Sequence, residues 1–216
     1  MIDKQHMKDR MCEGKLYIAS HLPPEDEMKE ACLDRFNNAP RSEATVRTEY
    51  LRPMLGGMGK NCYIEPRLHV DHGYNVFLGD NVYFNTGCII LDQCPITIGD
   101  NTLFGPRVSL LGALHPIDAA IRNLLVEGGK PITIGKDCWF GGDVTVCPGV
   151  TVGDGTVIGA GSVITKDIPA NVIAVGNPCK VLRPITEEDH KYWKAQLDEF
   201  TSDTGIFSQK YHKDIS

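Results

Sequence analysis

The sequence has no long hydrophobic run. Its apolar stretches, such as Cys88-Ile89-Ile90-Leu91, fall far short of the ~20 residues of a membrane-spanning helix. The first residues contain no apolar signal core, so we expect a cytoplasmic protein. Basic residues are fewer than acidic ones, and the 216 residues carry a net charge of −6. This charge argues against non-specific electrostatic binding of nucleic acid. We therefore expect neither a membrane nor a nucleic-acid partner.

Paired cysteine motifs are also missing. None of the eight cysteines forms a Cys-x-x-Cys pair, which disfavours zinc-ribbon and thioredoxin-type sites. Without a secretory signal, we expect free thiols that pack as small hydrophobic side chains.

Glycine is nearly absent from both ends of the chain, because 20 of the 22 glycines lie between Gly56 and Gly176. Residues 1–60 predict a helical cap whose third helix runs from Ser42 to about Leu55, whereas residues 184–216 predict a helix from Thr186 to about Phe200 and a polar tail. The sequence thus indicates three segments, with residues 61–183 between the two helical ends.

The middle segment is a repeat with a period of six. An apolar side chain recurs at Ile134, Phe140, Val146, Val152, Ile158 and Ile164. Small or β-branched residues recur four places later, at Cys138, Val144, Val150, Thr156, Ser162 and Ile168. The same series appears upstream, with a slip of two residues, at Leu78, Phe84 and Ile90 and then at Ile98, Phe104 and Leu110. A period of six fits neither a helix nor a hairpin and is typical of a hexapeptide parallel β-helix. We therefore predict a mainly β fold.

One segment interrupts the count, at about residues 112–131. It predicts a loop expelled from the coil, and inserted loops on a repeat scaffold tend to carry function. His115 stands near the start of this loop. Because imidazole titrates near neutral pH, His115 is a candidate general base.

Several motifs resemble the maltose/galactoside O-acetyltransferases over about residues 5–185. They are Asn81-Val82-Tyr83-Phe84-Asn85, Leu91-Asp92, Ile98-Gly99-Asp100-Asn101, His115-Pro116-Ile117-Asp118, Arg122-Asn123, Glu127-Gly128-Gly129-Lys130-Pro131, the stretch Ile158 to Pro169, and Val175-Gly176-Asn177-Pro178-Cys179-Lys180-Val181. The resemblance implies a left-handed parallel β-helix with an N-terminal helical cap and a short C-terminal helix. It also implies transfer of an acetyl group from acetyl-CoA to a hydroxyl of a small sugar.

The resemblance assigns roles on the acceptor side. His115 matches the family's general base, and Asn85 matches a residue that holds the acceptor and stabilises the transition state. Asp71 and Asp92 match acceptor-binding positions. Glu127 lies in the same expelled loop, and our hypothesis is that its carboxylate fixes the tautomer of His115.

The resemblance assigns the acetyl-CoA side to Trp139, Gly142, Ala160, Thr165, Lys166, Lys180 and Arg183. It implies a homotrimer whose active sites lie between subunits, and Trp139 and Phe140 suit such an interface. No cysteine matches a family nucleophile, so we expect direct transfer in a ternary complex without a covalent acyl-enzyme. The resemblance implies no metal.

Three alternatives remain open. The acceptor can be an antibiotic or an amino acid. The family commonly has an aspartate after its Lys-Leu/Trp-Tyr segment, and the absence of a carboxylate at Ile18-Ala19-Ser20 weakens assignment to one particular sugar. A zinc hydro-lyase on the same fold would need His69, His72 and His115 as ligands. A non-catalytic β-helix scaffold is also compatible with the repeat.

Overall fold

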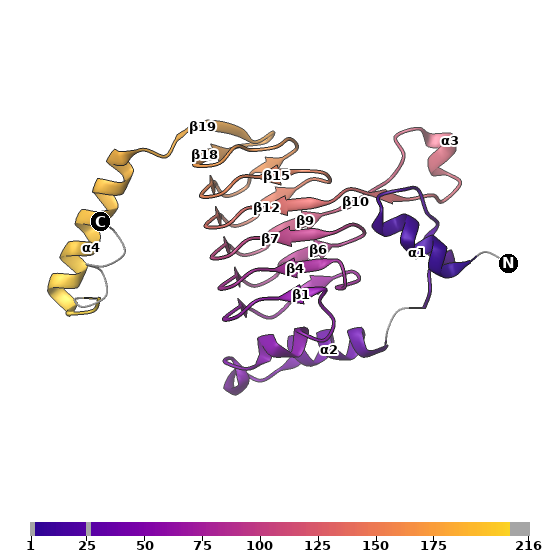
Figure 1. Ribbon diagram of the computed structural model, residues 1–216, viewed down its shortest axis with the longest axis horizontal. Coiled ribbons are helices and arrows are strands. Elements are labelled where there is room, and N and C mark those ends of the chain that lie inside the picture. Colours follow the sequence, from indigo (N-terminus) through magenta and orange to yellow (C-terminus); the bar gives the residue numbers. More distant parts are fainter. Residues whose placement is uncertain (1–2, 25–26, 208–216) are drawn as a thin grey trace. The chain divides into compact units, whose positions relative to one another are not determined.

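A helical cap begins the chain. The computed structural model describes residues 3–24 and 27–207. Helix α1 (Lys4–Cys12) begins after Asp3, whose carboxylate accepts hydrogen bonds from two backbone N–H groups of the first turn, as an N-cap residue does. Helix α2 (Glu27–Asn38) follows it (Figure 1). The helical nature of the N-terminal segment is therefore as predicted.

The predicted third helix is wrong. Residues 42–55 contain no α-helix; the chain instead forms the 3-10 turns η2 (Arg41–Glu43) and η3 (Arg47–Leu51), after the earlier turn η1 (Ala19–His21). Proline at position 53 cannot donate a helical hydrogen bond, which shortens the segment. The acidic pair at 25–26, expected at the start of α2, lies outside the described residues.

The cap binds the open end of the first coil. Asn37 Oδ1 accepts from the backbone N–H groups of Arg67 and Leu68, at 2.8 and 2.9 Å, and Thr48 Oγ1 accepts from the N–H of Ile64 at 3.1 Å. A free strand edge presents unpaired backbone groups. The last turn of α2 and the segment after it satisfy some of these groups, so tertiary contacts rather than helix propensity decide the conformation of that segment.

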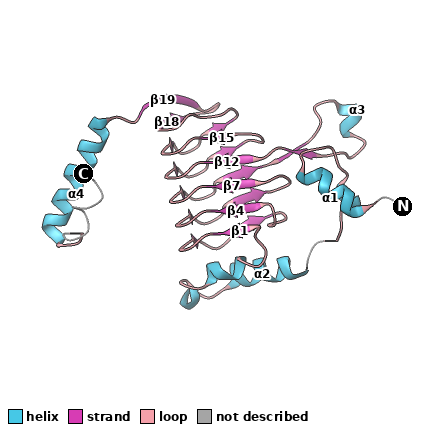
Figure 2. Cartoon of the chain, in the orientation of Figure 1, coloured by secondary structure: helices cyan, strands magenta, loops and turns pink. Residues whose placement is uncertain are grey.

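Three parallel sheets form the body of the molecule (Figure 1, Figure 2). The first sheet contains β1 (Gly57–Met58), β4 (Val76–Leu78), β7 (Ile96–Ile98), β12 (Ile132–Ile134) and β15 (Thr151–Val152). The second sheet contains β2 (Tyr63–Ile64), β5 (Tyr83–Phe84), β8 (Leu103–Phe104), β13 (Trp139–Phe140), β16 (Val157–Ile158), β18 (Val172–Val175) and β19 (Lys180–Pro184). The third sheet contains β3 (His69–Val70), β6 (Ile89–Leu91), β9 (Ser109–Leu111), β14 (Thr145–Val146) and β17 (Val163–Ile164). Because successive coils contribute strands to the three sheets in turn, the fold is the predicted parallel β-helix.

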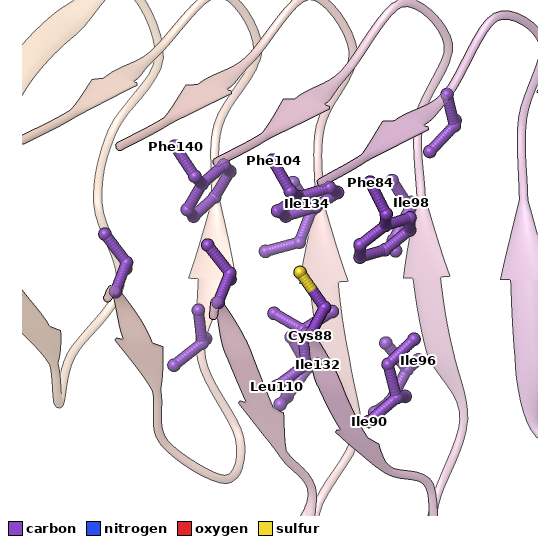
Figure 3. Packing of buried hydrophobic residues seen from close by; sticks show 14 of the residues in the cluster. Phe84, Cys88, Ile90, Ile96, Ile98, Phe104, Leu110, Ile132, Ile134 and Phe140 are labelled. Carbon is purple, nitrogen blue, oxygen red and sulfur yellow. The ribbon is translucent and has the colours of Figure 1, made fainter. Parts of the chain in front are cut away.

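Both hexad series point into the β-helix. The six apolar positions from Ile134 to Ile164 are at most 1% exposed. Parallel pairing in register places Phe104 between Phe84 and Phe140, with ring centroids 4.3 and 4.8 Å apart (Figure 3). Phe140 therefore lies in the core, and our expectation that it belongs to a subunit interface is wrong.

Polar turns separate the sheets. Asn61, Asn81, Asn101 and Asp137 occupy equivalent corners with φ of 56°, 58°, 57° and 58°, a conformation that asparagine and aspartate tolerate better than most residues. Their side chains form a continuous hydrogen-bonded row, with N···O distances of 3.2, 2.9 and 2.9 Å. The row links four coils along one edge of the β-helix.

The coils differ in length. Ile64 pairs with Phe84, 20 positions on, whereas Phe140 pairs with Ile158, 18 positions on. The two-residue slip in the hexad series falls between the third and the first sheet. The expelled loop leaves the coil at the same corner, because β9 ends at Leu111 and β12 begins at Ile132.

A second compact unit begins at Pro184. Its helix α4 (Glu187–Thr204) starts with a capping box between Thr186 and Asp189 and ends at Gly205, which has φ of 69°. The helix ends four residues later than predicted. Within residues 3–24 and 27–207, no helix combines the length and the apolar character needed to cross a membrane.

The aromatic stack should dominate the stability of the β-helix. We expect Phe104→Ala to lower the free energy of unfolding by about 3–5 kcal/mol, because it leaves a cavity between two rings. Ile117→Ala, at a side chain that is 98% exposed, should change it by less than about 0.5 kcal/mol. Denaturant titrations at one fixed protein concentration measure both, and equal losses would contradict the assignment of the core.

Candidate active site

Three connecting segments gather at one corner of the β-helix, between the third and the first sheet. They are residues 71–75, 92–95 and 112–131, and they belong to successive coils. Asp71, Asp92, His115 and Glu127 therefore lie along a single corner, which we call the loop corner.

The expelled loop contains a short hairpin. Strands β10 (Ala113–Leu114) and β11 (Gly128–Gly129) pair antiparallel, with Leu114 opposite Gly128, and helix α3 (Ala119–Arg122) lies between them. The same register, continued by one residue, places His115 opposite Glu127. Directly opposed residues of an antiparallel pair have Cβ atoms about 5 Å apart and point to one face. His115 is exposed.

Tyr17 contacts Glu127 from the other side. The two residues form an antiparallel bridge with N···O distances of 3.0 and 2.9 Å, and the Tyr17 hydroxyl donates to Glu127 Oε2 at 2.9 Å. Burial raises the pKa of Tyr17, and its hydrogen bond to Glu127 and the charges of Glu127 and Asp71 raise it further. Tyr17 is therefore a permanent hydrogen-bond donor beside two carboxylates.

Asp71 is held from two directions. Its carboxylate oxygen Oδ2 accepts a hydrogen bond from Gln93 Nε2, and its backbone carbonyl accepts one from Lys29 Nζ at 2.5 Å. Asp71 is half-buried, so part of its carboxylate faces solvent. Gln93 is 5% exposed, and its Oε1 has no partner among the described residues.

Asp92 is fully buried, although the resemblance gives it an acceptor-binding role. Its carboxylate accepts from the backbone N–H groups of His72 and Asn75, at 2.7 and 3.2 Å. Both groups belong to the segment that carries Asp71. In the described chain, Asp92 therefore shapes the Asp71 segment rather than presenting a free carboxylate.

Asn85 lies at a different corner, between the second and the third sheet. Its Oδ1 accepts from the N–H of Thr86 at 2.7 Å, which fixes the carboxamide. The register of the second sheet, continued past its strands, places Gly142 and Ala160 in later coils above Thr86, the residue next to Asn85. Within one chain, the structure thus separates Asn85 from His115 and puts Asn85 with two of the predicted acetyl-CoA residues.

The other predicted acetyl-CoA residues are exposed. Trp139 is 54% exposed and points outward from the second sheet, since neighbouring residues of a strand alternate between its faces. Thr165 and Lys166 follow β17, and Lys180 and Arg183 lie on β19. These side chains lie on the outer surface of the last coils.

Several groups are not part of this arrangement. No three His, Cys, Asp or Glu side chains in the described ranges lie close enough to hold a metal ion, so His69, His72 and His115 do not form a zinc-ligand set there. A cavity of about 250 Å³ is lined by residues that include Lys8, Lys29, His72 and Tyr74.

Sequence reasoning missed Tyr17 and Gln93. Tyr17 is 110 residues away from Glu127 in the chain, and no local pattern connects them. Gln93 directly follows Asp92, so the two-residue slip in the hexad series was the available signal that this corner is unusual.

Comparisons with known proteins agree with the repeat. A model of the hexapeptide repeat of succinyl-transferase matches residues 131–166. A galactoside O-acetyltransferase of Escherichia coli is 39% identical over 189 residues, which cover 87% of this chain and 93% of the relative. A solved maltose O-acetyltransferase from Clostridium difficile has a TM-score of 0.78 at 45% identity, covering 84% of this chain and 98% of that one. A solved galactoside acetyltransferase in complex with coenzyme A has a TM-score of 0.76 at 37% identity, covering 85% of this chain and 93% of that one.

The chain belongs to the maltose and galactoside O-acetyltransferase family. It is an acetyltransferase of this type, as the motifs around His115 and Asn85 predict. These relatives are covered almost completely, whereas 13–16% of this acetyltransferase has no counterpart in them. That share is close to the size of the second unit, Pro184–Ser216.

The buried carboxylate of Asp92 should make stability depend on pH. Burial raises the pKa of Asp92. The hydrogen bond from the backbone N–H of His72 acts in the opposite direction but is the smaller effect. The folded acetyltransferase therefore binds this proton more tightly than the unfolded chain. We expect its stability relative to Asp92→Asn to fall as the pH rises from about 4 through the raised pKa. Urea midpoints of both proteins across this range measure the difference, and parallel curves would contradict it.

The buried thiols should be unreactive, in agreement with direct acetyl transfer. Burial raises the pKa of Cys88 and Cys94 to about 11, and a protonated thiol is a poor nucleophile. In native protein near pH 8, iodoacetamide should label the half-buried Cys12, Cys32 and Cys147 and spare these two. Peptide mass spectrometry measures the labelling, and fast modification of Cys88 would contradict the burial of its thiol.

Proposed function

We propose that this acetyltransferase transfers the acetyl group of acetyl-CoA to a hydroxyl of a small sugar, with His115 as general base. The observation that carries the proposal is the position of His115. It is an exposed imidazole on the expelled loop, opposite the carboxylate-bearing Glu127 in the β10–β11 register and at the same corner as Asp71. An imidazole oriented by a carboxylate is a common means of deprotonating a hydroxyl.

The reaction balances without a covalent enzyme intermediate. The unprotonated ring nitrogen of His115 takes the proton of the acceptor hydroxyl while that oxygen bonds to the thioester carbonyl carbon. The resulting oxyanion collapses, the carbon–sulfur bond breaks, and the imidazolium returns its proton to the leaving thiolate. The products are the acetyl ester and coenzyme A.

Asn85 suits the stabilisation of charge or the binding of the acceptor. Since its Oδ1 accepts from the N–H of Thr86, its Nδ2 group is directed away from that bond and is available as a donor. A preorganised amide donor stabilises a developing oxyanion without reorganisation during the reaction.

Carboxylates also contribute to the proposed acceptor site. Asp71 presents its half-buried carboxylate at the loop corner, and carboxylate oxygens accept hydrogen bonds from sugar hydroxyls. Asp92 supports it by holding the backbone of the segment that carries Asp71. The relatives named as maltose and galactoside acetyltransferases support a sugar as the acceptor.

The acetyl-CoA site follows the second sheet and its corner. Trp139, Gly142 and Ala160 lie together on successive coils, and the small residues allow a ligand to approach the backbone. Lys166, Lys180 and Arg183 supply cations for the phosphates. The neighbour solved in complex with coenzyme A supports this part of the proposal.

We further propose a homotrimer with each site between two subunits. The outward side chains of the second sheet include Tyr63, Leu103 and Trp139, which are 36%, 44% and 54% exposed in the single chain. An exposed apolar row of this kind suits burial against another copy. Asn85 lies at a corner of this sheet and His115 at the loop corner, so a cyclic arrangement allows the two to meet across an interface.

The first experiment measures thiol release from acetyl-CoA with a panel of sugars, antibiotics and amino acids. We expect sugar-dependent release, and His115→Ala should lower kcat by about 10²–10⁴-fold, the usual contribution of a general base. His190→Ala, at an exposed histidine of α4, is the matched control and should keep the wild-type rate. Release that depends on another acceptor class would overturn the sugar assignment, and an active His115→Ala would overturn the general base.

Mixing two inactive variants tests the shared site. Co-refolded His115→Ala and Asn85→Ala chains should regain about a quarter of the wild-type rate, because one interface in four combines two intact residues in a cyclic assembly. Light scattering gives the size of the same sample. Absence of any recovery from a trimeric mixture would show that both residues act from one chain.

A further inference from the structure

We propose that Tyr17 is a positioning residue, which holds the Glu127 carboxylate in place for His115 and thereby couples the N-terminal cap to the active-site loop. This inference rests on the proposed function, because it gives a purpose to the Glu127–His115 pair. The resemblance to the family assigns no role to Tyr17, which ends the segment Gly14-Lys15-Leu16-Tyr17.

The pairing pattern puts the three side chains in one row. Glu127 forms an antiparallel bridge with Tyr17, and the β10–β11 register places it opposite His115. In antiparallel sheets, directly opposed residues point to the same face. Glu127 therefore stands in the centre of the row, between the phenol and the imidazole.

The hydrogen bond leaves one carboxylate oxygen for the histidine. The Tyr17 hydroxyl donates to Glu127 Oε2, so this oxygen is fixed on the cap side. Tyr17 is 2% exposed and remains protonated, because burial and the carboxylates of Glu127 and Asp71 disfavour its anion. A fixed donor on one oxygen orients the other oxygen, Oε1, towards the opposite side of the row, where His115 lies.

The remaining contacts of Tyr17 explain why the cap is needed. Its backbone N–H and C=O both bond to Glu127, so an isolated antiparallel bridge joins the segment between α1 and α2 to the hairpin. The Cys94 thiol, which lies near Tyr17, donates a hydrogen bond to the backbone carbonyl of Met11 at 3.3 Å. Figure 1 shows α1 beside the β10 hairpin at one edge of the stacked coils. The loop is thus anchored by a part of the chain outside the repeat.

Tyr17→Phe tests the hydroxyl alone, since it keeps the ring and both backbone bonds. Tyr50→Phe is a matched control, because the Tyr50 hydroxyl donates to Glu43 Oε2 at 2.6 Å within the cap and does not touch the loop. Glu127→Gln and the double variant Tyr17→Phe/Glu127→Gln complete a cycle, which separates an effect through Glu127 from an independent one.

The primary measurement is the tautomer of the His115 imidazole, read from its ring-nitrogen shifts by NMR in the full-length protein, with the signal identified from His115→Ala. A carboxylate that accepts from one ring nitrogen fixes the proton on that nitrogen, so Glu127→Gln should change the ratio of the two tautomers. Tyr17→Phe should change the ratio in the same direction, and the double variant should show no further change. Asp71→Asn is measured alongside, because Asp71 is the other carboxylate near Tyr17. This readout needs no acceptor and no turnover.

The kinetic measurement follows with the acceptor found in the panel. Tyr17→Phe should lower kcat on the order of tenfold and leave KM for acetyl-CoA unchanged. Tyr50→Phe should match the wild type in both respects.

The outcomes separate this inference from the proposed function. A wild-type His115 tautomer ratio in Tyr17→Phe, or full additivity with Glu127→Gln, would overturn the positioning role while His115→Ala still abolishes acetyl transfer. An active His115→Ala would instead remove the proposed mechanism on which the inference rests.

Discussion

The parallel register between coils is the constraint on which the rest of the structure depends. Phe104 can stack on Phe84 and Phe140 only if each coil repeats the inward positions of the last. Interiors pack as densely as organic crystals, so a residue added within a strand would turn every following side chain to the wrong face. Extra residues are therefore accepted only at corners.

This constraint explains where the chemistry lies. The loop corner is the place where the early coils are longer and where residues 112–131 leave the coil. The coil supplies a rigid support whose interior is filled by apolar side chains. The insertion places the imidazole of His115 outside that interior. Asp92 connects the core of the coil to the loop corner, because its buried carboxylate holds the backbone of the segment that carries Asp71.

Much of the fold could be predicted from the sequence, because the inward positions recur every six residues. Their apolar side chains therefore form a regular pattern along the chain. Ile134 to Ile164 are buried as the series predicts. The helix predicted at 42–55 does not form, because Thr48 and its neighbours bind the open strand edge of the first coil instead. The prediction of Phe140 at an interface is wrong because its place in the hexad series turns its side chain into the core.

The sequence by itself determined the period, and with it the β-helix, the expelled loop and the identity of His115 as the candidate base. These follow from local spacing, which a single chain displays along its length. Only the tertiary structure decided that Asp92 is buried, that Asn85 and His115 occupy different corners, and that Tyr17 holds Glu127 across 110 residues. Such contacts depend on the register between distant segments, because hydrogen bonds and burial are set by neighbours in space rather than in sequence.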